Sequence, residues 1–333
     1  MPGDRELRVL VLTPEWPSEA HPGAGTFVVH QVDSLRARNV LVDVMQFRGG
    51  ASPRRYWRAH AAFLQKIRVG RYDLVHAHFG QAGFIAVMQN KLPVVVTFHG
   101  SDVFGIPRGS VSAVAKDGVL RLVSRVAASR AQKVIAVSRR VAGRIARADV
   151  DIIPMAVSAH FHQLDSADSR AELRWPSDEM SVLFVGDPQN EIKRFALAEA
   201  SVRLLAEQMP NVRLRVCWNE EIARVPVYMN AADVLLITSV HEGGPLVLSE
   251  ALACGLPVVS VDVGIVRERL SGVQGCVVLA NDRQETIAGA LRTALERGGR
   301  LLPASSSQDG PDFVAARVED VYRKALTERE HRR

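Results

Sequence analysis

The chain has 333 residues, and 47% of them are hydrophobic, which is enough to form two globular domains with separate cores. Its net charge of +6 is uneven, because residues 1–160 carry +11 (22 Lys and Arg against 11 Asp and Glu) and residues 161–333 carry −5 (20 against 25). The three cysteines are few, odd in number and set in apolar segments, which indicates reduced core thiols rather than disulfides or a metal cluster.

Targeting signals are not expected. No apolar run approaches the length of a bilayer span, and the first six residues are too short and polar for a signal peptide, so we expect a cytoplasmic protein. The basic first half favours an acidic partner such as anionic lipid, a phosphorylated acceptor or nucleic acid, although a solvated basic surface explains it equally simply.

Short apolar runs alternate with helical segments through the first half, which predicts a parallel, doubly wound sheet of the α/β class. The expected strands are 7–13, 40–47, 73–79, 93–98, 133–137 and 151–153. A loop rich in Pro and Gly follows the first strand, and a helix is expected from Thr26 to Arg38. A polar stretch, 158–179, then separates this half from the next.

The second half repeats the alternation. Its expected strands are 181–185, 213–217, 234–238, 257–261 and 276–279, so a second Rossmann-like domain is predicted. Open parallel sheets bind ligands outside the carboxyl ends of their strands, and two such domains facing one another create a central cleft.

Residues 242–250 carry the most informative motif, since they follow the buried strand 234–238. Gly243 and Gly244 permit positive φ and a close approach of a ligand to the backbone, and Pro245 suits the first position of a helix running to about Ala253. The free amides and positive dipole end of that helix would face an anion such as a phosphate.

Glu250 lies in this helix among residues that are apolar on every side. A buried, unpaired carboxylate is costly, so Glu250 is expected to bind a ligand or to face a polar cavity. The alternative is an internal salt bridge with Arg267 or Arg269.

Two metal hypotheses fail on the residues. His241 and Glu242 would need a second histidine at position 245 to form a helical zinc pair, and that position is Pro245. His76 and His78 share a face of one expected strand, but no further ligands are evident, so we assign them to a structural or cleft-edge role and expect no metal.

The stretch from His241 to Ser260 closely resembles retaining GT-B glycosyltransferases of family four, of the polysaccharide or teichuronic-acid type, whose signature is two glutamates at this spacing. The resemblance covers nearly the whole chain. It implies an acceptor-binding domain over 1–160, a nucleotide-sugar-binding domain over 161–312, and a last helix within 313–333 that crosses back to the first domain.

The resemblance also implies roles for individual residues. Glu250 would bind the ribose hydroxyls of the donor, Glu242 would bind the transferred sugar, and His99, at the end of an apolar strand, would lie beside that sugar. Lys193 fits the family's phosphate-binding lysine, and Gly25 lies in the loop that faces the donor. Backbone amides would hold the sugar and diphosphate around Gly243, Gly244, Pro245, Leu246 and Val247.

Three departures from the family pattern stand beside these roles. The family usually places an arginine directly after the glycine of its phosphate loop, whereas this chain has Asp187, so either Arg194 or an arginine of the first domain is expected to compensate. The usual linker sequence is replaced at residues 153–158, and the segment between Cys217 and Val225 is short.

The implied reaction is transfer of a hexose-type sugar from a nucleotide-diphosphate sugar to an acceptor hydroxyl with retention of configuration, without cofactor or metal. Its transition state would have oxocarbenium character and would be stabilised electrostatically as diphosphate departs. The alternatives are a GT-B-like epimerase or phosphorylase and a non-catalytic sugar-nucleotide-binding protein.

The acceptor is expected to be a sugar or a lipid-linked sugar. Residues 53–68 mix cations with aromatic side chains at helical spacing, which suits contact with an anionic membrane, although an ordinary amphipathic helix packed on the sheet is equally compatible. No nucleic-acid partner is expected, because no known binding module is present.

Overall fold

The computed structural model describes residues 6–19, 23–50, 52–105, 111–302 and 310–331. They form two compact units: the first combines the chain up to residue 18 with 24–156 and the segment from 311 onward, and the second combines 19–23 with 157–310. The boundaries expected at 160 and 312 lie within a few residues of this division. Each unit is described by itself.

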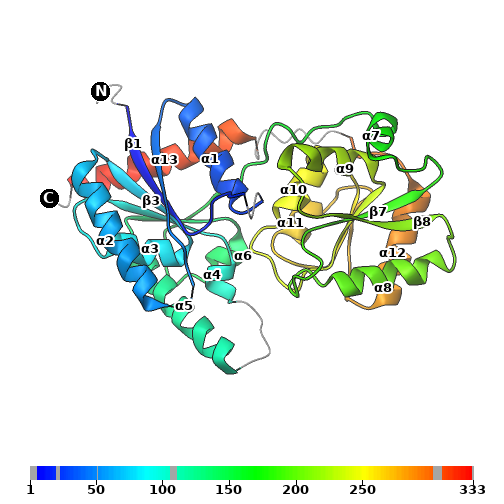
Figure 1. Ribbon diagram of the computed structural model, residues 1–333, viewed down its shortest axis with the longest axis horizontal. Coiled ribbons are helices and arrows are strands. Elements are labelled where there is room, and N and C mark those ends of the chain that lie inside the picture. Colours follow the sequence, from blue (N-terminus) through cyan, green and yellow to red (C-terminus); the bar gives the residue numbers. More distant parts are fainter. Residues whose placement is uncertain (1–5, 20–22, 51, 106–110, 303–309, 332–333) are drawn as a thin grey trace. The chain divides into compact units, whose positions relative to one another are not determined.

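The first unit is built on a six-stranded, wholly parallel sheet with the strand order β2-β1-β3-β4-β5-β6 (Figure 1). All six strands that the sequence predicts are present, each within about two residues of its expected ends. Their bounds are β1 Arg8–Thr13, β2 Leu41–Gln46, β3 Leu74–His78, β4 Val94–Phe98, β5 Lys133–Ala136 and β6 Val150–Ile152.

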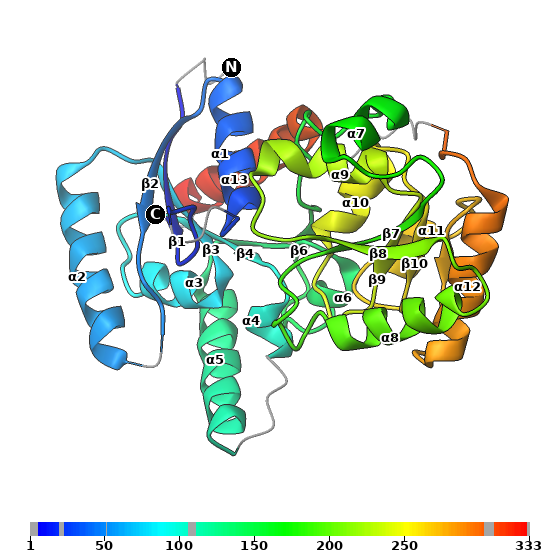
Figure 2. The same ribbon diagram turned by 45° about the vertical axis from the view of Figure 1, so that its right-hand side comes forward.

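Helices cover both faces of this sheet, as its long runs of Val, Leu and Ile require. Val9 and Val11 of β1 pack with α1 and α13, while Leu10 and Leu12 point to the opposite face, which α2, α3 and α5 cover (Figure 2). The helices are α1 Thr26–Ala37, α2 Pro53–Val69, α3 Phe79–Val87, α4 Ser101–Phe104, α5 Val111–Arg130, α6 Arg139–Ala142 and α13 Pro311–Glu330.

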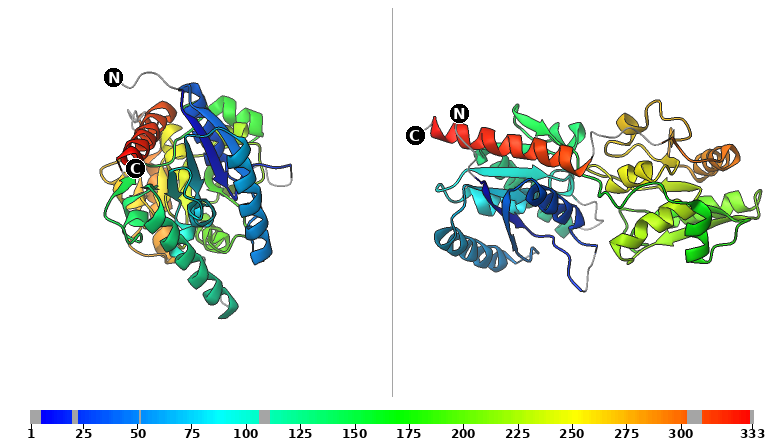
Figure 3. Two further views of the ribbon diagram at one scale, coloured as in Figure 1. Left: turned by 90° about the vertical axis from the view of Figure 1, so that its left-hand side faces the viewer. Right: turned by 90° about the horizontal axis from the view of Figure 1, so that it is seen from above.

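The last helix, α13, lies along the first unit's sheet and packs beside α1 (Figure 3). Its buried face packs against α1 and the strands β4 and β5, and Tyr322 is fully buried there. The core of the first unit therefore includes a segment that lies more than 150 residues beyond β6 in the sequence.

The second unit contains a five-stranded parallel sheet with the order β11-β10-β9-β7-β8. Helices α8 and α12 cover one face, and α7, α9 and α10 the other (Figure 2). The bounds are α7 Ser166–Leu173, β7 Met180–Val185, α8 Phe195–Ala206, β8 Val212–Cys217, a 3₁₀ turn Ile222–Arg224, α9 Val225–Ala231, β9 Val234–Ile237, α10 Leu246–Ala253, β10 Val258–Ser260, α11 Val266–Leu270, β11 Val277–Val278 and α12 Gln284–Arg297.

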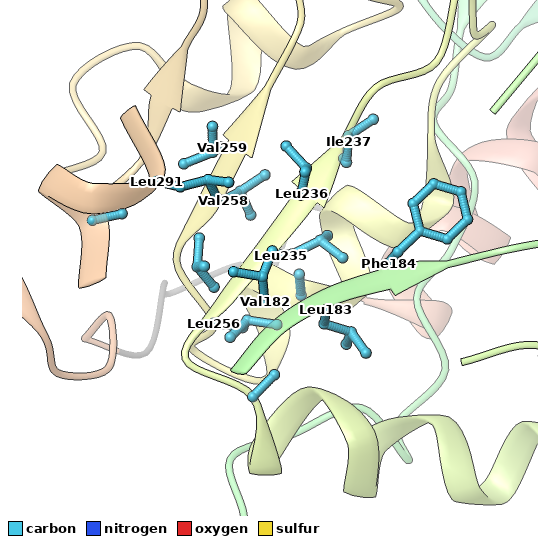
Figure 4. Packing of buried hydrophobic residues seen from close by; sticks show 14 of the residues in the cluster. Val182, Leu183, Phe184, Leu235, Leu236, Ile237, Leu256, Val258, Val259 and Leu291 are labelled. Carbon is cyan, nitrogen blue, oxygen red and sulfur yellow. The ribbon is translucent and has the colours of Figure 1, made fainter. Parts of the chain in front are cut away.

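The core of the second unit lies around its central strands. Figure 4 shows the aliphatic side chains of β7, β9 and β10 packed together with Phe184 and with Leu291 of α12. Cys217 and Cys254 are buried free thiols in this core, and burial raises the pKa of each to about 12, so they behave as small apolar residues rather than as nucleophiles.

In both sheets the order in which strands are added changes sides after the second strand, although all the strands run parallel. The first strand, β1 or β7, lies between the second strand and the third, so each sheet has a switch point beside it. Loops that leave the carboxyl ends on either side of a switch point diverge and expose the sheet edge, which is where open α/β sheets bind ligands. The predicted fold class, two doubly wound α/β domains, is confirmed.

Candidate functional site

In the second unit, the loops that follow β7 and β9 meet at the switch point through a charged pair. Lys193 Nζ lies 2.7 Å from Glu242 Oε1, and the Ser239 hydroxyl donates to the same carboxylate oxygen at 2.9 Å. Both charged side chains are partly buried. The structure thus brings together two predicted site residues that are 49 positions apart, and it adds Ser239, which the sequence did not single out.

The loop before Lys193 is shaped by Asp187, the residue that replaces the family's arginine. Its carboxylate accepts a hydrogen bond from the Gln189 amide at 2.8 Å, and its carbonyl accepts one from Asn190. Asp187 therefore stabilises a tight turn. Gly186, just before it, has φ of 138° and packs against the Lys193 stem, so the turn directs the lysine toward β9.

Arg194, the other predicted cation, makes hydrogen bonds within the second unit. Its guanidinium donates to the Thr238 carbonyl at 2.6 Å and to Asp282 at 2.6 Å. These bonds tie the loop after β7 to the end of β9 and to the segment after β11. Arg194 would have to exchange Asp282 for a phosphate in order to bind one.

Helix α10 begins one residue later than the motif predicts. Pro245 is its N-cap, with φ of −66° and ψ of 109°, rather than its first helical residue. No side chain caps the helix, so the amides of its first turn are not satisfied by a capping group. This arrangement suits an anion at the helix N-terminus.

Neither glycine of the pair before this helix, Gly243 or Gly244, uses the positive φ that glycine permits. Gly264, in the loop after β10, does adopt a left-handed conformation, with φ of 55°. A Cβ there would lie 2.8 Å from Pro245 Cδ and 3.2 Å from the Glu242 carbonyl oxygen. Gly264 thus allows the neighbouring loop to pack against the motif.

Glu250 is 8% exposed, and burial raises the pKa of its carboxyl to about 8, with a smaller opposing effect from Lys193. Its carboxylate forms no hydrogen bond or ion pair with any residue in the described ranges, and Arg267 pairs with Asp262 instead. The internal salt bridge considered as an alternative is therefore absent from the described part of the chain. A buried carboxyl without a partner is available to bind hydroxyl groups.

In the first unit, the loop after β1 places Gly25 at the start of α1. Gly25 has φ of 64°, and a Cβ on it would lie 2.5 Å from the Glu15 carbonyl oxygen, so glycine is required here. Two residues later, the Phe27 ring lies 4.7 Å from the His99 ring, measured between centroids. Gly25 and His99 thus lie at the same edge of the first sheet.

His99 follows β4 and is linked to a cluster of histidines on β3. His78 Nδ1 lies 3.0 Å from His99 Nε2, while His76 lies 2.7 Å from both Tyr322 Oη and Thr97 Oγ1. Burial lowers the pKa of His78 to about 3 and, together with His78, holds the pKa of His99 well below its ordinary value. The cluster is therefore neutral at physiological pH.

The turn that carries His99 is fixed by Asp102, a buried residue of α4. Its carboxylate accepts hydrogen bonds from the amides of Gly80, His99 and Gly100 at 2.8–3.2 Å. Burial nevertheless raises the pKa of Asp102 to about 6. Asp102 was not predicted as functional, although its place in the first turn after a strand was visible in the sequence.

Among the described residues, no group of three or more His, Cys, Asp or Glu side chains is arranged to hold a metal ion. In the same residues, no helix combines the length and apolarity that crossing a bilayer requires.

Helix α2 matches the expected amphipathic segment. Ala59, Phe63 and Ile67 are buried against the sheet, while Trp57 is 67% exposed. The outer face also carries exposed cations, which are Arg54, Arg55, Arg58 and Arg68.

Sequence comparisons place both halves of the chain in one group. Residues 3–161 match the family described as Glycosyltransferase Family 4, and residues 160–297 match Glycosyl transferases group 1. A D-inositol 3-phosphate glycosyltransferase of Xylanimonas cellulosilytica is 30% identical over 313 residues, covering 78% of this chain and 74% of that protein. The corresponding protein of Streptosporangium roseum is 27% identical over 321 residues, covering 79% and 72%.

Solved structures agree on the fold. Sucrose-phosphate synthase from Thermosynechococcus elongatus has a TM-score of 0.74 at 18% identity and is covered over 98% of both chains. The Anabaena protein HepE, solved in complex with UDP-glucose, has a TM-score of 0.63 at 16% identity, with 98% of this chain and 100% of that chain covered. These likenesses establish a GT-B fold.

Proposed function

The chain belongs to glycosyltransferase family 4, and from this premise we propose that it transfers a hexose-type sugar from a nucleotide-diphosphate sugar to an acceptor hydroxyl with retention of configuration. The observation that carries the proposal is the edge of the second unit, where the Lys193–Glu242 pair lies in the same motif as an uncapped helix N-terminus and a buried, unpaired Glu250. A cation, free amides and two carboxylates match a diphosphate flanked by hydroxyl-bearing sugars.

In this proposal Lys193 leaves Glu242 and binds the donor diphosphate. The backbone amides of Gly243, Gly244, Leu246 and Val247 contribute further donors, while Pro245, which has no N–H, fixes the turn into α10. Glu242 is then free to accept hydrogen bonds from hydroxyls of the transferred sugar, and Ser239 keeps its carboxylate oriented. Glu250 accepts hydrogen bonds from the ribose hydroxyls. Arg194 contributes to the diphosphate only after releasing Asp282.

The chemistry follows from the departing charge. As the bond between the anomeric carbon and the diphosphate breaks, the sugar gains oxocarbenium character and the leaving oxygen becomes more negative. Lys193 and the α10 amides stabilise that charge. The acceptor hydroxyl attacks from the same face, and its proton passes to the diphosphate, so neither a cofactor nor a metal is needed.

We assign roles to two residues at the carboxyl edge of the first unit by itself. His99, at the end of β4, would offer a hydrogen bond to a sugar oxygen. Gly25, whose positive φ the β1–α1 loop requires, would hold that loop in the turn from which its backbone faces a ligand.

For the acceptor we propose a sugar or lipid-linked sugar of a cell-surface polysaccharide or glycoconjugate, reached from the cytoplasmic face of the membrane. The support is the outer face of α2, with Trp57 exposed among arginines. Sedimentation with vesicles containing anionic lipid should pull down the protein, and the Trp57→Ala, Arg58→Ala variant should bind less. Equal binding by both proteins would refute this contact.

A donor panel tests the reaction. Calorimetric titration with UDP-, GDP- and ADP-sugars identifies the nucleotide, with UDP-glucose tested first because HepE was solved with it. Product analysis by NMR with sugar acceptors and D-inositol 3-phosphate then reports the configuration of the new bond. Transfer with retention supports the proposal, isomerised or phosphorolysed donor supports the epimerase or phosphorylase alternative, and binding without turnover supports a non-catalytic binder.

A further inference from the structure

A small cavity opens on the first unit among α4, α5 and the segment that follows α6 (Figure 1). Its volume is about 90 Å³, well below the roughly 300 Å³ of the smallest pockets that take whole small molecules. It therefore has room for one small group of a larger ligand. The base is apolar, the rim is cationic, and the described lining contains no carboxylate: Phe98, Val103, Arg121, Ser124, Arg125, Ala128, Arg144, Ile145 and Ala146.

Three arginines meet around a single aromatic residue, Phe104, beside this rim. The guanidinium carbon of Arg144 lies 5.6 Å from the centroid of the Phe104 ring, and that of Arg140 lies 5.9 Å from it. Arg121 donates to the Phe104 carbonyl at 2.7 Å. A guanidinium has five N–H donors, so these contacts hold Arg121 and Arg144 in place and use only part of their donors.

The cations of the rim have no acidic partner. Arg121, Arg125 and Arg144 form no ion pair with any carboxylate in the described ranges. Arg121 and Arg125 lie four residues apart on α5, a spacing at which like charges destabilise a helix. Arg147, close by in the sequence, is used differently, since it pairs with Asp149 and donates to carbonyls at the end of α5. The rim thus gathers charges that repel one another, and a bound anion would offset that repulsion.

A phosphoryl group fits this rim better than the other small anionic groups of metabolites. Guanidinium groups donate paired N–H bonds to phosphate oxygens, so they supply geometry as well as charge. A phosphate monoester carries about −1.5 to −2 charges at neutral pH, whereas a carboxylate carries only one. The apolar base formed by Phe98, Ala128 and Ile145 lowers the local dielectric constant, which strengthens the attraction of the arginines for such a group.

We propose that the cavity rimmed by Arg121, Arg125 and Arg144 binds the phosphoryl group of a phosphorylated ligand, at a site separate from the one for the donor diphosphate. The group is carried either by a soluble sugar phosphate or by the headgroup of a lipid. That this ligand is the acceptor rests on the proposed function. The binding of the phosphoryl group does not, because it follows from contacts within the first unit.

NMR of the full chain with nitrogen-15-labelled arginine tests the site directly. The Nε–H signals of the rim are assigned by their loss in single variants and followed while inorganic phosphate is added at constant ionic strength. We expect saturable shifts for Arg121, Arg125 and Arg144. Arg68, an exposed residue in the last turn of α2, lies outside the cavity and should not shift. Unmoved rim signals, or an equal shift of Arg68, would overturn the proposal.

Substitutions at the rim measure what each arginine contributes, with the Arg121 signal as the reporter. Arg125→Gln and Arg144→Gln should each weaken phosphate binding about threefold, and the double variant about tenfold, as expected for exposed charge pairs. Arg125→Lys keeps the charge without the paired donors and should fall between Arg125→Gln and the native protein. Arg68→Gln is the matched control and should bind phosphate normally. A folded double variant with native affinity would refute the site.

Two pairs of probes identify what carries the phosphoryl group. Glucose 6-phosphate is compared with glucose, and vesicles of phosphatidate in phosphatidylcholine are compared with phosphatidylcholine alone. Weaker binding of the sugar phosphate by the double variant assigns a soluble ligand, and weaker binding of the phosphatidate vesicles assigns a lipid headgroup. If only inorganic phosphate depends on the rim, the site holds an adventitious ion only, and the proposal is overturned.

Lys193→Ala separates this site from the proposed function. The variant should lose affinity for the nucleotide-sugar donor and keep the phosphate-dependent shifts of the rim arginines. Loss of those shifts in Lys193→Ala would mean that phosphate acts through the donor site, and would refute a separate cavity site. If the native chain binds no nucleotide sugar at all, the proposed function fails, while the phosphate titration still decides the cavity.

Discussion

The two units share one strand order around their switch points, yet their carboxyl edges carry opposite chemistry. In the first unit the edge is neutral, with histidines whose pKa values burial has lowered and an Asp102 enclosed by backbone amides. In the second unit the corresponding loops carry ion pairs, Lys193 with Glu242 and Arg194 with Asp282. One topology thus provides two differently charged edges, and in the proposed function the neutral edge suits hydroxyl groups and the charged edge a diphosphate.

The charged edge should be the more sensitive to losing a single side chain. Lys193→Ala removes the cation proposed to stabilise the departing diphosphate, and we expect kcat to fall by about 10²–10³-fold, as on removing one preorganised donor to a developing anion. Steady-state kinetics with the identified donor measures the effect. Lys324→Ala is the control, since Lys324 forms an exposed pair with Asp320 in α13, and its activity should be unchanged. A Lys193→Ala enzyme of normal kcat would remove the lysine from the mechanism.

Glu250 makes the charged edge sensitive to pH. Its pKa, about 8 in the fold against 4.5 as the ordinary value, means that the folded protein keeps a proton which the unfolded chain has released. The contribution of this group to the free energy of unfolding is therefore fully present below pH 4.5. It decreases by about 1.4 kcal/mol per pH unit between pH 4.5 and pH 8 and is lost above pH 8. Glu250→Gln lacks this dependence, so the free energy of unfolding of the variant should rise relative to that of the native protein between pH 6 and pH 8.

Denaturant unfolding at the two pH values measures this gain. Glu172→Gln, a substitution of an exposed glutamate on α7, should follow the native protein. Parallel pH profiles for the native protein and Glu250→Gln would show that the carboxyl is already ionised in the fold.

Backbone shape at the charged edge is tested by a pair of glycines. Gly264→Ala places a Cβ against Pro245 and the Glu242 backbone at positive φ, and we expect a loss of about 1–3 kcal/mol in stability together with a raised KM for the donor. Gly289→Ala, in the open interior of α12, should instead stabilise by about 0.5–1 kcal/mol. Thermal unfolding and kinetics distinguish them, and equal behaviour of the two would argue against a packing role for Gly264.

The neutral edge should respond to a lost hydroxyl with a smaller change. Tyr322→Phe leaves a buried nitrogen of His76 without its partner, and we expect the first unit to lose about 1–2 kcal/mol. Tyr228→Phe, whose hydroxyl donates to Glu220 in a partly buried pair, should cost less. Unfolding followed by near-ultraviolet dichroism compares the two, and a larger loss in Tyr228→Phe would contradict the importance given to the His76 contact.

Local patterns in the sequence were sufficient for the strands and for the position of the 242–250 motif, because buried parallel strands are short apolar runs with polar loops at their ends. They were not sufficient for contacts between distant residues. That Lys193 pairs with Glu242, or that Tyr322 reaches His76 across 246 positions, depends on tertiary packing that no spacing records.

The glycines show the same limit. Gly243 and Gly244 permit positive φ, but at this edge it is Gly186 and Gly264 that adopt it. Composition reveals where a chain can turn sharply, while the neighbouring loops decide which residue does. Pro245 likewise caps α10 instead of entering it, a shift of one residue that local propensity does not resolve.

The position of α13 has a consequence for synthesis of the chain. Since Val314, Val318 and Tyr322 fill the core beside α1, that face of the first sheet is only partly covered until residues 311–330 have left the ribosome, whereas the second unit is complete once residue 310 has emerged. We therefore expect the second unit to become resistant to protease before the first unit does, although synthesis of the first unit begins earlier. Digestion of arrested nascent chains ending near residue 310 would reveal this reversed order.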